Sequence, residues 1–237
     1  MDELATLDFP WPSDVPVLAL ASRLDDPRVL ALWERSLMFH LITWDAPELA
    51  SRVLTATSKL VCNDLFGLEK YLTWGSALQR AVVTGLPERH LAVANLGAFM
   101  NRCGMDRRLV IQATTVADEL LSNALRSQPG APVELAYAFD EDAFALSVRD
   151  AHGTLDRTTL REFLGRALAR APSMEDDDDG AGLGLYVAFS LARELVFNLA
   201  PGVQTEVIAL FGTDPDAFRQ PSATSRAVSL FDPAAAV

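Results

Sequence analysis

The stretch from Val116 to Arg126 reads Val-Ala-Asp-Glu-Leu-Leu-Ser-Asn-Ala-Leu-Arg and predicts the second half of an amphipathic helix that begins near Asp106. Apolar residues recur at positions 109, 113, 116, 120 and 124, which is the spacing of one helix face. Glu119 and Asn123 are four residues apart, so they lie one turn apart on a single face. A carboxylate and a carboxamide placed in this way can hold a divalent cation and a water between them. The alternative is an ordinary solvated helix face.

Two unusual features follow this helix. The alternating runs Val133–Phe139 and Phe144–Val148 predict a hairpin, and Asp150 continues the inward register of its second strand. A carboxylate on a core face costs free energy unless a donor binds it. Further on, Gly180-Ala181-Gly182-Leu183-Gly184-Leu185 precedes a predicted apolar helix, Tyr186–Glu194. Glycines allow close approach of a ligand and a helix N-terminus attracts anions, although a plain flexible loop remains an alternative.

The N-terminal part predicts a β-α-β-α-β order, which favours parallel strands. Its strand candidates are Val15–Ala21, Phe39–Trp44 and Leu60–Cys62, and its helices begin near Asp25 and Ala46. Phe66–Thr84 is interpreted as a connector. The later predicted elements are helices at Pro87–Cys103 and Thr158–Arg170 and strands at Leu195–Leu199, Val203–Phe211 and Ala227–Phe231.

The order of these features resembles the Bergerat-fold ATP-binding domain of the GHKL superfamily, which includes gyrase and the histidine kinases. The compact size is most similar to that of the anti-sigma-factor serine kinases, and the resemblance covers about residues 85–212. It implies ATP and Mg²⁺ as cofactors, with Mg²⁺ on Asn123 and Glu119 as the general base. It also implies that Asp150 binds the adenine amino group and that Thr205 supports the adenine end. The remaining implied nucleotide-binding residues are Gly153, Gly180, Gly182, Leu183 and Gly184.

The chain departs from the family pattern after Asp150. The family has Asp-x-Gly-x-Gly, whereas His152 and Thr154 occupy both glycine positions here and Gly153 lies between them. This change can reshape the base pocket. The acidic run Glu175–Asp179 lies just before the glycine-rich stretch and opposes a triphosphate unless metal or solvent screens its carboxylates. The alternative is a solvated, mobile lid.

The sequence gives less support for a functional role of the three histidines and Asp64 than for the residues named above. His90 lacks the acidic residue and the proline that would follow a phosphorylated histidine, so histidine kinase activity is not expected. His40 is expected to pack in a strand, and His152 is the histidine nearest the predicted pocket. Asp64 would follow the third N-terminal strand of a degenerate receiver-like or docking module.

Composition narrows the class of partner. The 237 residues carry a formal net charge of −12, which disfavours nucleic acid and anionic membranes as partners. The two cysteines, Cys62 and Cys103, have neither metal-site nor disulfide-framework spacing. A cytoplasmic protein with a protein partner is therefore expected, and both a monomer and a homodimer are compatible with the sequence.

The predicted fold is an α+β two-layer sandwich with helices on one face of a mixed, largely antiparallel sheet. The predicted divisions are a small α/β module at 1–75, the ATP-binding domain at 80–212 and a C-terminal tail at 213–237. The leading hypothesis is a bacterial signalling protein that binds Mg·ATP and acts as a serine/threonine kinase or as an ATP-gated regulator of a partner protein. The alternative is a non-catalytic scaffold that has lost nucleotide binding and works by protein interaction.

Overall fold

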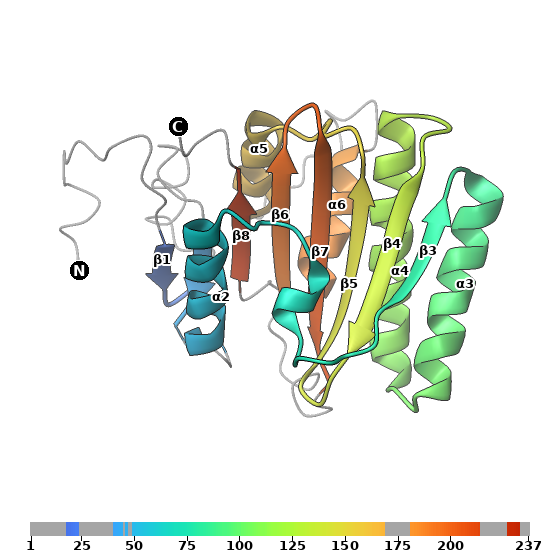
Figure 1. The fold of residues 1–237 in the computed structure, drawn as a ribbon, viewed down its shortest axis with the longest axis horizontal. Coiled ribbons are helices and arrows are strands. Elements are labelled where there is room, and N and C mark those ends of the chain that lie inside the picture. The colour runs from blue at the N-terminus through green and yellow to red at the C-terminus, as the bar shows by residue number, and fades with distance from the viewer. Residues whose placement is uncertain are drawn as a thin grey trace.

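The computed structural model describes residues 18–23, 40–44, 46, 49–168, 181–213 and 227–232. Its centre is an eight-stranded sheet with the strand order β1-β2-β8-β6-β7-β5-β4-β3 (Figure 1). The strands are β1 (Leu18–Ala21), β2 (His40–Thr43), β3 (Gln79–Val83), β4 (Val133–Phe139), β5 (Ala143–Asp150), β6 (Glu194–Ala200), β7 (Gln204–Gly212) and β8 (Ala227–Phe231). The pairs β1–β2 and β6–β8 are parallel and the other neighbours are antiparallel. A mixed α/β fold with a largely antiparallel sheet is thus confirmed, while the Bergerat assignment and the receiver-like module stay predictions.

Helices cover both faces of the sheet, so the prediction of helices on one face alone was wrong. One face, called the pocket face below, packs against α3 (Leu86–Arg102), α4 (Arg107–Ser127), α5 (Arg157–Leu168) and α6 (Ala181–Leu191). On the other face, the reverse face, lie α2 (Leu49–Cys62) and the short 3-10 helix η1 (Leu68–Tyr71). Figure 1 shows α2 and η1 in front of the sheet and α4 and α6 behind it. No helix in these described ranges is both long and apolar enough to cross a lipid bilayer.

Helix α4 is the long amphipathic element that its sequence predicts. Its N-cap is Asp106, whose side chain accepts a hydrogen bond from the backbone N–H of Arg108 at 2.8 Å, and this satisfies one of the free donors of the first turn. Its inward residues are fully buried against the sheet; they include Leu109, Ala113 and Val116. The position of Glu119 and Asn123 is therefore set by the apolar stripe of the same helix.

The β4–β5 hairpin also forms as expected, because Asp140 closes its turn. One carboxylate oxygen accepts from the N–H groups of Asp142 and Ala143. The other accepts from the N–H and the hydroxyl of Thr73. These four hydrogen bonds fix the turn and tie it to the segment before β3. Burial by itself raises the pKa of Asp140, but the hydrogen bonds outweigh it and the pKa is lowered overall.

Three sequence predictions about elements were wrong. Leu60–Cys62 is the last turn of α2 and not a strand, so Asp64 follows a helix and is exposed. Phe66–Thr84 is more than a connector, since it contains η1 and the edge strand β3. The glycines Gly182 and Gly184 lie within α6, which begins at Ala181, and not in a loop before the helix.

Strand β8, in the predicted tail, lies between β2 and β6, so β1 and β2 belong to the same sheet as the rest. The helix predicted from Asp25 and the acidic run Glu175–Asp179 fall outside the described residues. The predicted domain boundaries stay predictions.

Candidate nucleotide-binding site

A cavity of about 300 Å³ lies on the pocket face, between α4, α5, α6 and the strands β5 and β7. Its walls are mostly apolar and include Leu120, Val148, Leu155, Phe163, Leu185 and Val207. Three residues predicted from the sequence line this same cavity, namely Asn123, Asp150 and Thr205. A cavity of this size, apolar with a few convergent polar groups, is typical of small-molecule sites.

Asp150 and Thr205 are paired across the sheet. Asp150 ends β5 and is the register partner of Thr205 near the start of β7. Each is buried, with exposed fractions of 8% and 3%. The Oδ1 atom of Asp150 accepts from the backbone N–H groups of His152 and Gly153, both at 2.9 Å. The hydroxyl of Thr205 is buried and has no hydrogen-bond partner, which costs free energy unless a ligand or water satisfies it.

Gly153 lies in the turn after Asp150 and packs against the turn between β6 and β7. It adopts a φ of +60°, and a Cβ atom there would lie 2.3 Å from the carbonyl oxygen of Ala200. Its own carbonyl accepts from the N–H of Gly202 at 3.1 Å, which joins the turn after Asp150 to the turn between β6 and β7. Gly153 is not part of the cavity lining. The structure therefore gives it a role in backbone packing, on which the position of Asp150 depends.

Asn123 and Glu119 lie where α4 meets α6. A Cβ atom on Gly184 would lie 2.6 Å from Glu119 Oε2 and 3.0 Å from Asn123 Nδ2, so the absent side chain lets α6 approach both polar groups. Asn123 Nδ2 is buried without a partner. Asn123 Oδ1 accepts a long hydrogen bond of 3.4 Å from the exposed guanidinium of Arg126. Asn123 is therefore the junction between the cavity and a cationic group on the surface.

The other predicted site residues are placed less directly. Gly182 and Leu183 lie in the first turn of α6, while Gly180 lies outside the described residues. Glu119 is one turn from Asn123 but is not among the residues that line the cavity. His152 has a buried Nε2 without a partner and is also absent from the lining. His90 is on the exposed side of α3.

Some lining residues were missed by the sequence interpretation. They are polar groups of α5 together with one residue at the end of α4: Ser127, Thr159 and Glu162. Thr154, whose place in the glycine pattern predicts a reshaped base pocket, lines the cavity as well. Helix α5 gave no local sequence signal for the site, because its approach to β5 and β7 is decided by packing.

Within the described ranges, no three His, Cys, Asp or Glu side chains are grouped so that they could hold a metal ion. A scan against models of known protein families finds no match, and a search of curated proteins finds none either. The functional interpretation therefore depends on the cavity itself.

Proposed function

We propose that this protein binds Mg·ATP in the cavity and acts as a serine/threonine kinase or as an ATP-gated regulator of a partner protein. One observation carries the proposal. Two buried polar atoms without partners, Asn123 Nδ2 and Thr205 Oγ1, occur on the lining of the same cavity as the carboxylate of Asp150. Buried polar groups are hydrogen-bonded in the great majority of cases, so a polar ligand that binds beside Asp150 accounts for both unpaired atoms.

An adenine ring suits the inner part of the cavity. Its exocyclic amino group is a hydrogen-bond donor for the carboxylate of Asp150, and the hydroxyl of Thr205 can hydrogen-bond to a ring nitrogen or to a bridging water. The flat faces of the base would lie against the aliphatic walls formed by residues such as Val148 and Leu185. Asp150 would then recognise the adenine base by hydrogen bonding, and the apolar walls would pack against its ring.

The phosphates would lie toward the outer end, near Asn123 and Arg126. The guanidinium of Arg126 is exposed and can turn from Asn123 Oδ1 to a phosphate oxygen, since Arg binds phosphate with two N–H groups. That movement releases Asn123 Oδ1 for Mg²⁺, which prefers oxygen ligands and is commonly shared with substrate phosphates. Mg²⁺ bound there would neutralise phosphate charge during transfer.

In the kinase form of the proposal, Glu119 is the base. Its carboxylate accepts the proton of a serine or threonine hydroxyl of the partner, and the hydroxyl oxygen bonds to the γ-phosphorus. The bond between the γ-phosphorus and the β–γ bridging oxygen breaks, and ADP leaves with its electrons. In the regulator form, nucleotide occupancy changes partner affinity and no phosphoryl group moves. Glu119→Gln separates the two forms. In the kinase form it abolishes phosphorylation of the partner and leaves nucleotide binding intact, whereas in the regulator form it changes nothing.

Nucleotide binding itself is tested by thermal unfolding with and without Mg·ATP. A ligand present at 100 times its Kd stabilises a single site by about 2.7 kcal/mol. We expect this stabilisation in the unmodified protein and its loss in Asp150→Asn and Asn123→Ala. Ser147→Ala is the matched control, because Ser147 is a buried polar residue of β5 that does not line this cavity. Absence of stabilisation by millimolar Mg·ATP in the unmodified protein would refute the proposal.

The second candidate is a scaffold that keeps the fold and binds no nucleotide. It is favoured by Thr154, which occupies an expected glycine position and lines the cavity. If Thr154 blocks the base, Thr154→Gly creates Mg·ATP-dependent stabilisation that the unmodified protein lacks. If the unmodified protein already shows it, the scaffold hypothesis fails.

A further inference from the structure

We propose that the reverse-face segment Leu49–Tyr71 is a regulatory cover whose attachment to the sheet is strengthened when the nucleotide pocket is occupied. This inference rests on the proposed function, because its ligand is the nucleotide. The physical link is a set of buried and partly buried hydrogen bonds, called the polar lock below, formed by Lys59, Gly67, Tyr71, Asn198 and Glu206.

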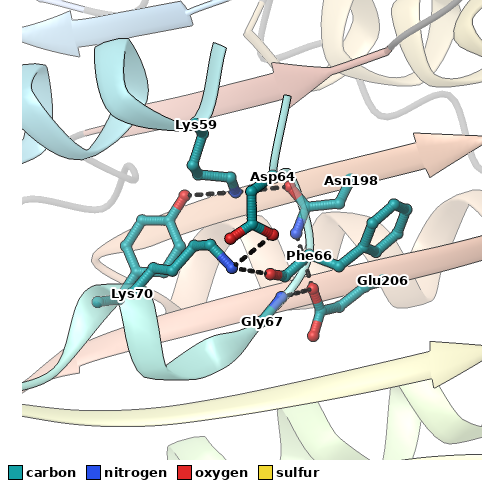
Figure 2. Close-up of polar contacts among 8 residues, drawn as sticks. Lys59, Asp64, Phe66, Gly67, Lys70, Asn198 and Glu206 are labelled. Atoms are coloured by element: carbon teal, nitrogen blue, oxygen red, sulfur yellow. Dashed lines mark hydrogen bonds and ion pairs between the residues drawn. The ribbon is translucent and has the colours of Figure 1, made fainter. Parts of the chain in front are cut away.

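The polar lock joins the cover to strands β6 and β7 (Figure 2). Lys59 donates to Asn198 Oδ1 at 2.8 Å and to the hydroxyl of Tyr71 at 3.0 Å. Asn198 Nδ2 donates to Glu206 Oε2 at 2.8 Å, and the same oxygen accepts from the N–H of Gly67 at 2.8 Å. Glu206 therefore connects directly to the cover through Gly67 and indirectly through Asn198 and Lys59.

Burial of the polar lock raises the free-energy cost of breaking its hydrogen bonds. Asn198 is fully buried, and Lys59 and Glu206 are each 2% exposed. Breaking one bond leaves a desolvated polar or charged group without a partner, which costs more than the bond itself contributes. Lys70 fixes the chain beside Gly67 by donating to the carbonyl of Phe66 and pairing with Asp64, so Gly67 is held close to Glu206 (Figure 2).

The pocket and the lock meet on consecutive residues of β7. Thr205 lines the cavity, whereas Glu206 belongs to the lock, because successive side chains of a strand point to opposite faces. On the neighbouring strand β6, Asn198 is the register partner of Glu206 and Leu199 is the partner of Thr205. A change at the start of β7 therefore affects both sites.

Both the pocket and the polar lock hold the first residues of β7 in place. β7 begins at Gln204, so Thr205 and Glu206 are its second and third residues, and strand ends open locally more readily than strand centres. The turn before β7 is itself held by Gly153, whose carbonyl accepts from Gly202 N, while Asp150 holds Gly153 N. A ligand bonded to Asp150 and Thr205 thus fixes this strand end from two sides.

The sign of the coupling follows from that geometry. Opening of the first residues of β7 separates Glu206 from Gly67 and Asn198, which weakens the attachment of the cover. The cover then remains attached to β6 through the Lys59–Asn198 bond and the Arg52–Glu194 ion pair. A ligand that suppresses the opening already orders the start of β7. Formation of the lock then costs less conformational entropy, so the lock forms more completely. By thermodynamic reciprocity, an intact lock strengthens nucleotide binding by the same factor.

Hydrogen–deuterium exchange of the whole protein, with and without saturating Mg·ATP, tests the first direction. We expect exchange to slow around Asp150–Gly153 and Gln204–Glu206, and also by about fivefold or more in Leu49–Tyr71. Protection at the pocket without any change in Leu49–Tyr71 overturns the coupling and leaves the proposed function standing. No protection anywhere overturns both.

Affinity measurements test the reverse direction. We expect Glu206→Leu, which removes the acceptor for Gly67 and Asn198 without touching the cavity lining, to raise the Kd for Mg·ATP by about fivefold or more. Ser147→Ala is again the control, because Ser147 is a buried reverse-face residue of β5 that makes no bond within the lock, and its Kd should match that of the unmodified protein. An unchanged Kd in folded Glu206→Leu overturns the proposal. The exchange experiment on the unmodified protein decides the matter if that variant does not fold.

Discussion

His40 gives a quantitative test of burial in the N-terminal part of the sheet. It lies on β2, is 0% exposed, and packs against the ring of Phe231 with 4.4 Å between ring centroids. Neither ring nitrogen has a hydrogen-bond partner. Burial, with a smaller effect from the charge on Lys59, lowers the pKa of His40 from 6.5 to about 3.

The sign of the resulting pH dependence follows from proton uptake. Between pH 6.5 and pH 3 the unfolded chain protonates this histidine and the folded chain does not, so stability falls as the pH falls through this window. One pH unit corresponds to about 1.4 kcal/mol. Acidification to about pH 5 should therefore lower the free energy of unfolding by about 2 kcal/mol through His40 alone.

Urea unfolding at about pH 7 and about pH 5, followed by circular dichroism, measures this effect. The variant His40→Leu, of similar size and without titratable atoms, should lose about 2 kcal/mol less than the unmodified protein on acidification. His90→Leu is the control, because His90 is exposed on α3. Equal losses in the unmodified protein and in His40→Leu would refute the argument, since His40 would then be hydrated or hydrogen-bonded in the folded state.

Two further predictions concern single residues. Gly153→Ala should destabilise the protein by more than about 1 kcal/mol in thermal unfolding, because of its positive φ and the nearby carbonyl of Ala200. Gly130→Ala, also at positive φ but with open space around it, should cost less, and equal costs would contradict the packing argument. Burial lowers the pKa of Lys59 from 10.5 to about 7, so the unfolded state holds more protons above pH 7 and stability should rise from about pH 7 to about pH 9. Lys59→Met should remove this rise in urea titrations, and a persisting rise would show that another group causes it.

Much of the pocket face could be predicted because its signals are local. The apolar stripe predicts α4, and the alternation in Val133–Phe139 and Phe144–Val148 predicts the hairpin. The inward register of Asp150 follows from the two-residue period of a strand. The prediction that Asn123, Asp150 and Thr205 share one site is a statement about order along the chain, and the cavity brings the three together.

Other elements could not be predicted, because competing patterns are similar over short ranges. Leu60–Cys62 is apolar and β-branched enough for a strand, yet it completes the last turn of α2, which packs on the sheet. Gly182 and Gly184 have low intrinsic helix propensity, but α6 continues through them, and the missing side chain of Gly184 lets it lie against α4.

The sequence by itself determined the amphipathic helices, the hairpin and the inward direction of Asp150, because each depends on the period of a single element. Only the tertiary structure decided that β8 joins β2 to the rest of the sheet and that Lys59 bonds to Asn198, 139 residues away. Asn198 and Glu206 stand out in the sequence only as polar residues within apolar strands. Asn198 binds Lys59 of α2 and Glu206 binds the N–H of Gly67, both far away along the chain. Burial of these hydrogen bonds requires α2 and the strands to be assembled together.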